Sequence, residues 1–199
     1  MPIGIMGGTF NPIHIGHLII SEFVRCEFEL DYILFVPNGN PPHKKKSNLI
    51  DANLRLSLIE KAIRDNNYFK SSDIELSLNK INYTVDTLKA LKSMYSKEKF
   101  YFLIGMDTLF ELDSWKDFNT VAKLTDFIVY QRQGYEKKKI DLKIKELEEL
   151  YGTSVFISNG PYIDISSTFI RERANKGLTL RYLVPDSILE DVLKIYGGT

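Results

Sequence analysis

The sequence has very little cysteine and no excess of charge of either sign. Its single cysteine, Cys26, excludes an internal disulfide framework and a zinc site built from several cysteines. Because apolar residues such as Val24 and Phe28 flank Cys26, we expect it to be a small buried side chain. The 26 basic and 26 acidic residues give a formal net charge of 0. This balance argues against a general nucleic-acid coat or a polybasic membrane binder.

Charged side chains are also absent from residues 1–21, as they would be in a signal peptide or a membrane-spanning helix. This segment contains two prolines, four glycines and two histidines, and it lacks the basic residues that precede a signal sequence. We therefore expect a cytoplasmic protein that binds neither membranes nor nucleic acid. The length of 199 residues predicts one domain over 1–199, with a C-terminal helical part from about 165 to 199 on the same core.

Short apolar runs alternate with amphipathic stretches along the whole chain. The runs are the expected strands, at residues 3–6, 32–36, 100–104, 127–130 and 155–157. The stretches have helical spacing: they cover 85–95, 140–151 and 188–193, and an earlier one places Ile20, Phe23, Val24 and Phe28 on one face. Nearly continuous apolar strands separated by helices predict an α/β fold, with a doubly wound, mainly parallel sheet and helices on both faces.

The segment 7–18 (GGTFNPIHIGHL) follows the first expected strand, where ligands of parallel sheets bind. Its glycines let the backbone approach a phosphate, and a helix that begins nearby directs free N–H groups toward it. His14 and His17 would project from one side of the first helical turn. Both can donate hydrogen bonds to phosphate oxygens as charge develops during phosphoryl or nucleotidyl transfer. A zinc site is less favoured, because the remaining histidine, His43, has no acidic partner close by.

A second anion-binding pattern, ISSTFIR at 165–171, lies near the C-terminus. Serine or threonine before a helix can cap it and present N–H groups to an anion. Arg171 follows Thr168 by three residues, so its guanidinium would reach the same phosphates as a fork of donors. The sequence thus predicts two distant segments that bind phosphate together.

Segment 7–17 resembles the H-x-G-H signature of the nucleotidyltransferase superfamily, and 165–171 resembles its I-S-S-T-x-x-R motif. Segments 37–44, 83–88, 105–109 with Trp115, and 182–185 follow the order seen in bacterial nicotinate-nucleotide adenylyltransferases. The resemblance runs from residue 3 to about residue 196. It implies a Rossmann-like fold and transfer of the adenylyl group of ATP to nicotinate mononucleotide, with Mg²⁺ carried by the ATP phosphates and no metal ligand from the protein.

The resemblance also implies a role for each matching residue. Catalysis would depend on His14, His17 and Arg171. ATP would be bound by Gly7, Gly8, Thr9, Phe10, His14, His17, Lys44, Gly105, Asp107, Ile165, Ser166, Ser167, Thr168 and Arg171. The mononucleotide would be bound by Asn38, His43, Lys44, Thr84, Trp115 and Lys116, with Trp115 stacked on the pyridine ring. We expect hydrogen-bond donors and no acidic residue at the ring substituent, so that a carboxylate is preferred to a carboxamide.

Other functions stay open at this point. The protein could be another small-molecule adenylyltransferase, acting on nicotinamide mononucleotide or phosphopantetheine, although Pro42-His43-Lys44, segment 83–88 and Trp115 argue against the phosphopantetheine type. It could be a fragment of a class I aminoacyl-tRNA synthetase, but 199 residues leave no room for an anticodon domain. A non-catalytic nucleotide sensor is a further alternative, which the two histidines and Arg171 do not favour.

Overall fold

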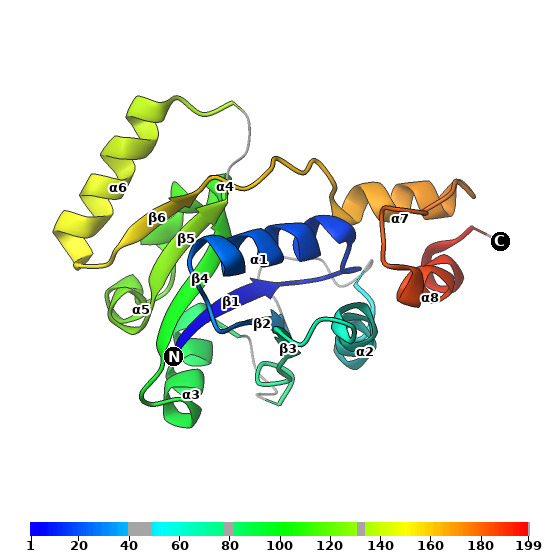
Figure 1. Cartoon of the computed structure of the whole chain (residues 1–199), viewed down its shortest axis with the longest axis horizontal. Coiled ribbons are helices and arrows are strands. Elements are labelled where there is room, and N and C mark those ends of the chain that lie inside the picture. The colour runs from blue at the N-terminus through cyan, green and yellow to red at the C-terminus, as the bar shows by residue number, and fades with distance from the viewer. Residues whose placement is uncertain (40–48, 78–81, 131–133, 199) are drawn as a thin grey trace.

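The computed structural model describes residues 1–39, 49–77, 82–130 and 134–198. Its centre is a six-stranded sheet in which all neighbouring strands among the described residues pair in parallel, in the order β3-β2-β1-β4-β5-β6 (Figure 1). The strands are β1 (Pro2–Gly8), β2 (Tyr32–Pro37), β3 (Phe69–Ser71), β4 (Lys99–Gly105), β5 (Asp126–Tyr130) and β6 (Val155–Ser158). Five of them coincide with the predicted apolar runs. The edge strand β3 was not predicted, because three residues are too few to show a pattern.

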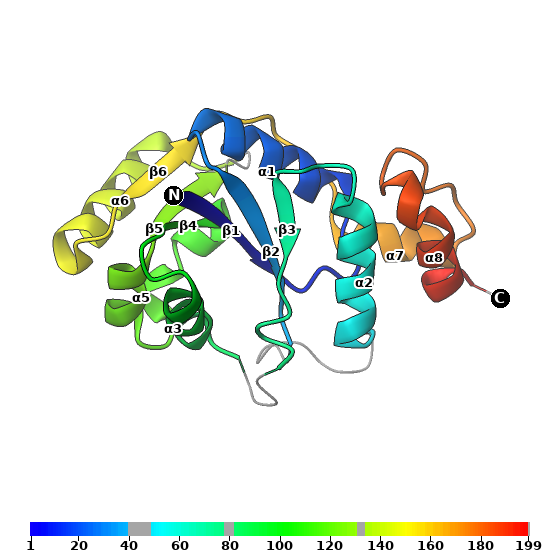
Figure 2. The same ribbon diagram turned by 60° about the horizontal axis from the view of Figure 1, so that its bottom comes forward.

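Helices cover both faces of the sheet, as predicted. They are α1 (Ile15–Glu27), α2 (Ala52–Ile63), α3 (Thr84–Met94), α4 (Met106–Leu109), α5 (Phe118–Leu124), α6 (Lys137–Tyr151), α7 (Ser167–Asn175) and α8 (Asp186–Tyr196). Figure 2 shows α1 on one side of the sheet and α3 and α5 on the other. Within the described parts of the chain, no helix is long and apolar enough to cross a membrane.

Alternate residues of each strand supply two separate cores. Ile3 and Ile5 of β1 face the core under α3, α5 and α6, whereas Met6 belongs to the core under α1, α2, α7 and α8. Successive side chains of a strand point to opposite faces, so this division is what a sheet covered on both sides requires. Buried residues of α7 and α8, such as Ile170 and Val192, belong to the second core.

The strand order reverses at β1, and this reversal determines where a ligand fits. The chain runs from β1 to β2 and β3 on one side, then crosses to β4, β5 and β6 on the other. The loops that leave β1 and β4 therefore diverge, which opens a crevice beyond the carboxyl ends of these neighbouring strands. The helix α7 lies at this end of the sheet in both views (Figures 1 and 2).

The prediction that Cys26 is a buried side chain was wrong. Cys26 is exposed, and Phe23 is 48% exposed. The buried residues of α1 are Gly16, Ser21 and Val24. Cys26 lies two residues after Val24, about 200° around the helix at 3.6 residues per turn, so it faces away from the sheet. The helix face that packs on the sheet is thus the one with the small residues Gly16 and Ser21, and it is not defined by apolar side chains alone.

We expect the thiol of Cys26 to react with a soluble thiol reagent in the native protein, because the side chain is exposed. Titration with a chromogenic disulfide should modify one thiol per chain, at a rate within about tenfold of that in denaturant. A thiol that reacts only after unfolding would show that Cys26 is buried as the sequence first suggested.

Candidate active site

Two pockets lie at the carboxyl edge of the sheet, and Tyr130 at the end of β5 lines both. The first, the histidine pocket, has a volume of about 250 Å³ and is lined by His14, Gly16, His17, Ile20, Tyr130, Ile163, Ile165, Ser166, Ser167, Thr168 and Arg171. The second, the tryptophan pocket, has about 200 Å³ and is lined by Gly7, Asn38, Glu75, Thr84, Phe102, Leu103, Ile104, Gly105, Thr108, Trp115 and Tyr130. The structure thus brings together most of the predicted site residues in two neighbouring pockets.

The two histidines come together at the start of α1. His14 has extended backbone angles (φ −147°, ψ 168°) and directly precedes the helix, whereas His17 lies in its first turn. Their ring centroids are 3.7 Å apart. The backbone N–H of His14 donates a hydrogen bond to Nδ1 of His17 at 3.3 Å. Nδ1 of His17 is therefore an acceptor, and in the neutral ring the proton lies on Nε2.

Burial keeps both imidazoles neutral at pH 7. It lowers the pKa of His14 from 6.5 to about 4. Burial and the nearby His14 hold the pKa of His17 well below its usual value. Neutral imidazoles donate hydrogen bonds without adding positive charge. Among the described residues, the positive potential in the histidine pocket comes from Arg171 and from the N-termini of α1 and α7, whose dipoles favour an anion.

The ISSTFIR motif is joined to the histidine loop by direct hydrogen bonds. Ser166 caps α7, accepting from the backbone N–H of Phe169 at 3.1 Å, as predicted. Ser167 Oγ donates to the carbonyl of Pro12 at 2.8 Å. Arg171 donates through Nη1 to the carbonyl of Asn11 at 2.7 Å and through Nη2 to Thr168 Oγ1 at 3.1 Å. These bonds use two of the five N–H donors of the guanidinium and fix its plane.

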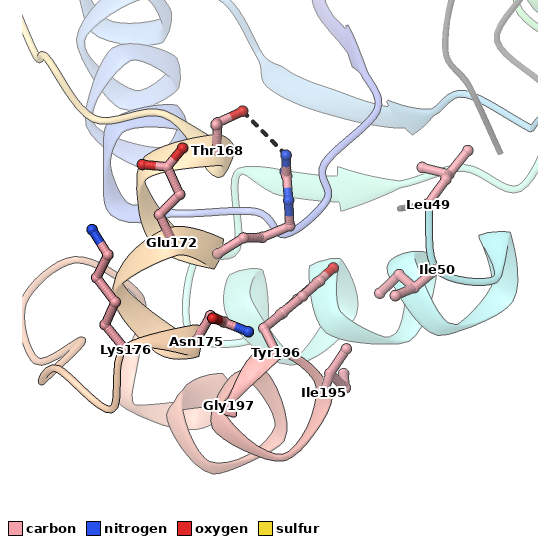
Figure 3. Close-up of a pocket in the computed structure, with 10 residues that line it drawn as sticks. Leu49, Ile50, Thr168, Glu172, Asn175, Lys176, Ile195, Tyr196 and Gly197 are labelled. Atoms are coloured by element: carbon pink, nitrogen blue, oxygen red, sulfur yellow. Dashed lines mark hydrogen bonds between the residues drawn. The ribbon is translucent and has the colours of Figure 1, made fainter. Parts of the chain in front are cut away.

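Figure 3 shows the surroundings of this motif from the side of α8, with the bond to Thr168 as a dashed line. A larger pocket of about 630 Å³ lies there between α7, α8 and the start of α2. Tyr196 of α8 donates its hydroxyl hydrogen to Asn11 Oδ1 at 2.8 Å. Burial raises the pKa of Tyr196 to about 12, so the hydroxyl stays protonated at neutral pH. Asn11 is thus held by both Arg171 and Tyr196.

A buried arginine that the sequence reasoning missed joins the two pockets. Arg55 of α2 is 1% exposed. Its Nη1 donates to the carbonyl of Thr9 and its Nη2 to that of Asn38, each at 2.7 Å, and its Nε donates to Ile50 at 3.2 Å. These carbonyls belong to the loops after β1 and β2 and to the segment before α2. An arginine in an amphipathic helix gives no sequence signal of burial, because most such arginines are exposed.

The tryptophan pocket has an aromatic wall and several polar groups. Trp115 packs edge-on against Phe102, with ring centroids 5.8 Å apart, and leaves part of its surface in the pocket. Thr84 is the first residue of α3, so the N-terminus of that helix reaches the pocket. Asn38 follows β2, and its backbone N–H donates to the carbonyl of Gly8 at 2.8 Å. Gly105 lines this pocket and not the histidine pocket.

From the sequence we expected no acidic residue at the ring substituent, yet one lines this pocket. Glu75 is 6% exposed and lines the pocket. Its carboxylate accepts from the hydroxyl of Thr87 at 2.7 Å and from Asn38 Nδ2 at 3.3 Å. Burial raises the pKa of Glu75, although these hydrogen bonds and the charge of Arg55 oppose that effect. Glu75 lies in irregular chain after β3, where no periodicity indicates which side chains point inward.

Several predicted residues do not line either pocket. The ring of Phe10 is buried against His17 and Phe35. Asp107 is exposed and accepts a hydrogen bond from Tyr135. The Lys116 ammonium lies 4.0 Å from the ring centre of Tyr83. Gly8 and Thr9 also line neither pocket. His43 and Lys44 lie outside the described residues.

Comparison with known proteins agrees with this geometry. A family model described as cytidylyltransferase-like matches residues 5–173. Two curated relatives are named "Probable nicotinate-nucleotide adenylyltransferase". The one from Thermoanaerobacter sp. (strain X514) is 41% identical over 187 residues, covering 94% of this chain and 89% of the relative. The one from Clostridium novyi (strain NT) is 39% identical over 183 residues, covering 92% of each.

A solved structure, the Plasmodium falciparum nicotinic acid mononucleotide adenylyltransferase complexed with NaAD, has the same fold, with a TM-score of 0.77 and 21% identity over 98% of both chains. The chain therefore belongs to the cytidylyltransferase-like family of nucleotidyltransferases. Within that family it belongs with the nicotinate-nucleotide adenylyltransferases.

Replacing Arg55 with leucine should lower the free energy of unfolding by about 2–4 kcal/mol, because a buried side chain loses its three hydrogen bonds and three half-buried carbonyls lose their donor. Urea unfolding measures this difference. Arg64→Leu is the matched control, since the Arg64 side chain is 65% exposed, and it should change stability by no more than about 0.5 kcal/mol. An Arg55→Leu protein as stable as the wild type would contradict a role for Arg55 in holding the loops.

Proposed function

We propose that this protein transfers the adenylyl group of ATP to nicotinate mononucleotide, giving nicotinate adenine dinucleotide and pyrophosphate. The observation that carries the proposal is the meeting of the two pockets at Tyr130. One pocket has the features that bind phosphate, and the other has an aromatic wall beside polar groups. The names of the relatives, and of the structural neighbour with its bound dinucleotide, support the same reaction.

The histidine pocket is the proposed site of the ATP phosphates. Arg171 would hold them with its remaining N–H donors, and Ser166–Thr168 would add hydroxyl and backbone donors at the start of α7. Nε2–H of His17 would donate to the α-phosphate. The predicted contributions of Gly8, Thr9, Asp107 and Lys44 to ATP binding stay part of this proposal.

The tryptophan pocket is the proposed site of the mononucleotide. Trp115 would offer a flat face to the pyridine ring. The ring carboxylate would lie at the N-terminus of α3, near Thr84 and Asn38, where the helix dipole favours an anion. The 5′-phosphate would then point toward the shared wall at Tyr130, and so toward the histidine pocket.

The chemistry that this arrangement allows is a single displacement. An oxygen of the mononucleotide 5′-phosphate would attack the α-phosphorus of ATP while the bond from that phosphorus to the bridging oxygen breaks. Pyrophosphate leaves with the bonding electron pair. The nucleophile is already an anion, so no general base is needed, and the protein contributes positioning and charge stabilisation.

Mg²⁺ would arrive bound to the ATP phosphates as part of the substrate. The donors around the histidine pocket are imidazole nitrogens, hydroxyls and a guanidinium. Mg²⁺ prefers oxygen ligands, carboxylates above all, so this set suits phosphate better than a protein-held Mg²⁺. Among the described residues, no group of three His, Cys, Asp or Glu side chains could hold a metal ion.

The proposed function is tested by incubating the protein with ATP, Mg²⁺ and one mononucleotide at a time, and identifying the product by mass. Nicotinate mononucleotide should give nicotinate adenine dinucleotide with stoichiometric pyrophosphate. Preferential adenylylation of phosphopantetheine would show a different adenylyltransferase. Absence of pyrophosphate release with every acceptor would leave the nucleotide sensor as the better function.

His17→Ala should lower kcat by about 10²–10³-fold, because this is the typical effect of losing one hydrogen-bond donor to the charge that develops in the transition state. The KM for ATP should change much less, since Arg171 and the two helix N-termini bind the phosphates in the ground state. Steady-state kinetics at saturating mononucleotide separates the two effects. A His17→Ala enzyme with the kcat of the wild type would remove His17 from the mechanism.

Trp115 is the only tryptophan in the chain, so its fluorescence reports on the tryptophan pocket directly. Nicotinate mononucleotide should change the emission in a saturable way, with or without ATP, because the ring would stack on the indole. Ribose 5-phosphate, which lacks the ring, is the control and should leave the emission unchanged. If the mononucleotide also leaves it unchanged, Trp115 does not contact the ring.

A further inference from the structure

Glu75 is the acidic side chain among the described residues that line the tryptophan pocket, and no basic side chain lines it. The position of the carboxylate is fixed. Oε1 accepts from Thr87, a residue of α3, and Oε2 accepts from Asn38, which follows β2. At 6% exposure, little solvent screens its charge.

The charge of Glu75 is not neutralised by a direct ion pair within the described part of the chain. Arg55 of α2 is the charged group that acts on it there, and within the described residues its guanidinium donates to three carbonyls. The groups that contact the carboxylate, from Thr87, Asn38 and Gly39, are all neutral donors. A carboxyl group that has no ion-pair partner among the described residues when it is ionised is thus built into the wall of a pocket of about 200 Å³.

We propose that Glu75 is a selectivity-determining residue of the tryptophan pocket, which weakens the preference for a mononucleotide with a ring carboxylate and favours one with a ring carboxamide. The inference deepens the proposed function and rests on it. Two carboxylates in one small pocket repel each other. A carboxamide carries no charge, and its N–H groups can donate to the acceptor sites that a carboxylate offers.

This proposal predicts how selectivity depends on pH. The substrate carboxylate is ionised throughout the accessible range, whereas burial raises the pKa of Glu75 from 4.5. As pH rises through that pKa, Glu75 gains its charge. The ratio of kcat/KM for the acid to kcat/KM for the amide should therefore fall with rising pH.

The sharpest variant is Glu75→Gln, which removes the charge and keeps the shape. The glutamine oxygen can still accept from Asn38. The Thr87 hydroxyl can donate to the carbonyl of Tyr83, 3.4 Å away, and accept from the new amide. We expect the acid-to-amide ratio to rise on the order of tenfold, through a lower KM for the acid, and to become independent of pH. Glu60→Gln, the same change at an exposed residue of α2, should keep the wild-type ratio.

The remaining outcomes are distinct. An unchanged or lower ratio in Glu75→Gln would overturn the inference while leaving the proposed function intact. The pH profile of the wild-type enzyme needs no variant, so a ratio that rises with pH would overturn it even if Glu75→Gln fails to fold. If the wild type adenylylates neither mononucleotide, the proposed function fails and this inference fails with it.

Discussion

The guanidinium of Arg55 is the constraint on which both pockets depend. It donates to the carbonyls of Thr9, after β1, and Asn38, after β2. The carbonyls of Asn11 and Pro12 are held in the same way by Arg171 and Ser167. Because these carbonyls are paired inside the protein, they do not present negative partial charge to an entering phosphate. The acceptors of Arg55 among the described residues are neutral carbonyls, and burying a cation against neutral acceptors is costly. Its role in fixing the loops after β1 and β2 explains why an arginine is buried there.

In the histidine pocket, the histidines supply hydrogen-bond donors, and other groups supply the positive charge. Burial leaves His14 and His17 uncharged at neutral pH, so they suit the donation of short, directed hydrogen bonds as charge develops. The lasting attraction for phosphate comes from Arg171 and from the N-termini of α1 and α7. The tryptophan pocket has the opposite combination, since the N-terminus of α3 attracts an anion and Glu75 repels it. On the proposal made above, the selectivity between acid and amide is the balance between attraction by the helix N-terminus and repulsion by Glu75.

Much of this arrangement could be predicted from the sequence, and the failures have physical reasons. The doubly wound sheet followed from apolar runs that are long enough to show a pattern, and the motifs around His14 and Arg171 were brought together as expected. Cys26 was misplaced because hydrophobicity alone does not show which helix face is flat enough to pack on a sheet. Arg55 and Glu75 were missed because their partners are backbone carbonyls and residues from distant segments. Such contacts exist only once the fold has formed.

The central claim is that the two pockets hold both substrates at once, so that the mononucleotide phosphate attacks ATP directly. The stereochemistry at the α-phosphorus tests it most directly. The substrate is a single diastereomer of ATP in which sulfur replaces one non-bridging oxygen of the α-phosphate, so that this phosphorus is chiral. One in-line displacement predicts inversion of configuration at that phosphorus in the dinucleotide product. Retention would mean two displacements, with an adenylylated protein group between them, and would contradict direct transfer between the pockets.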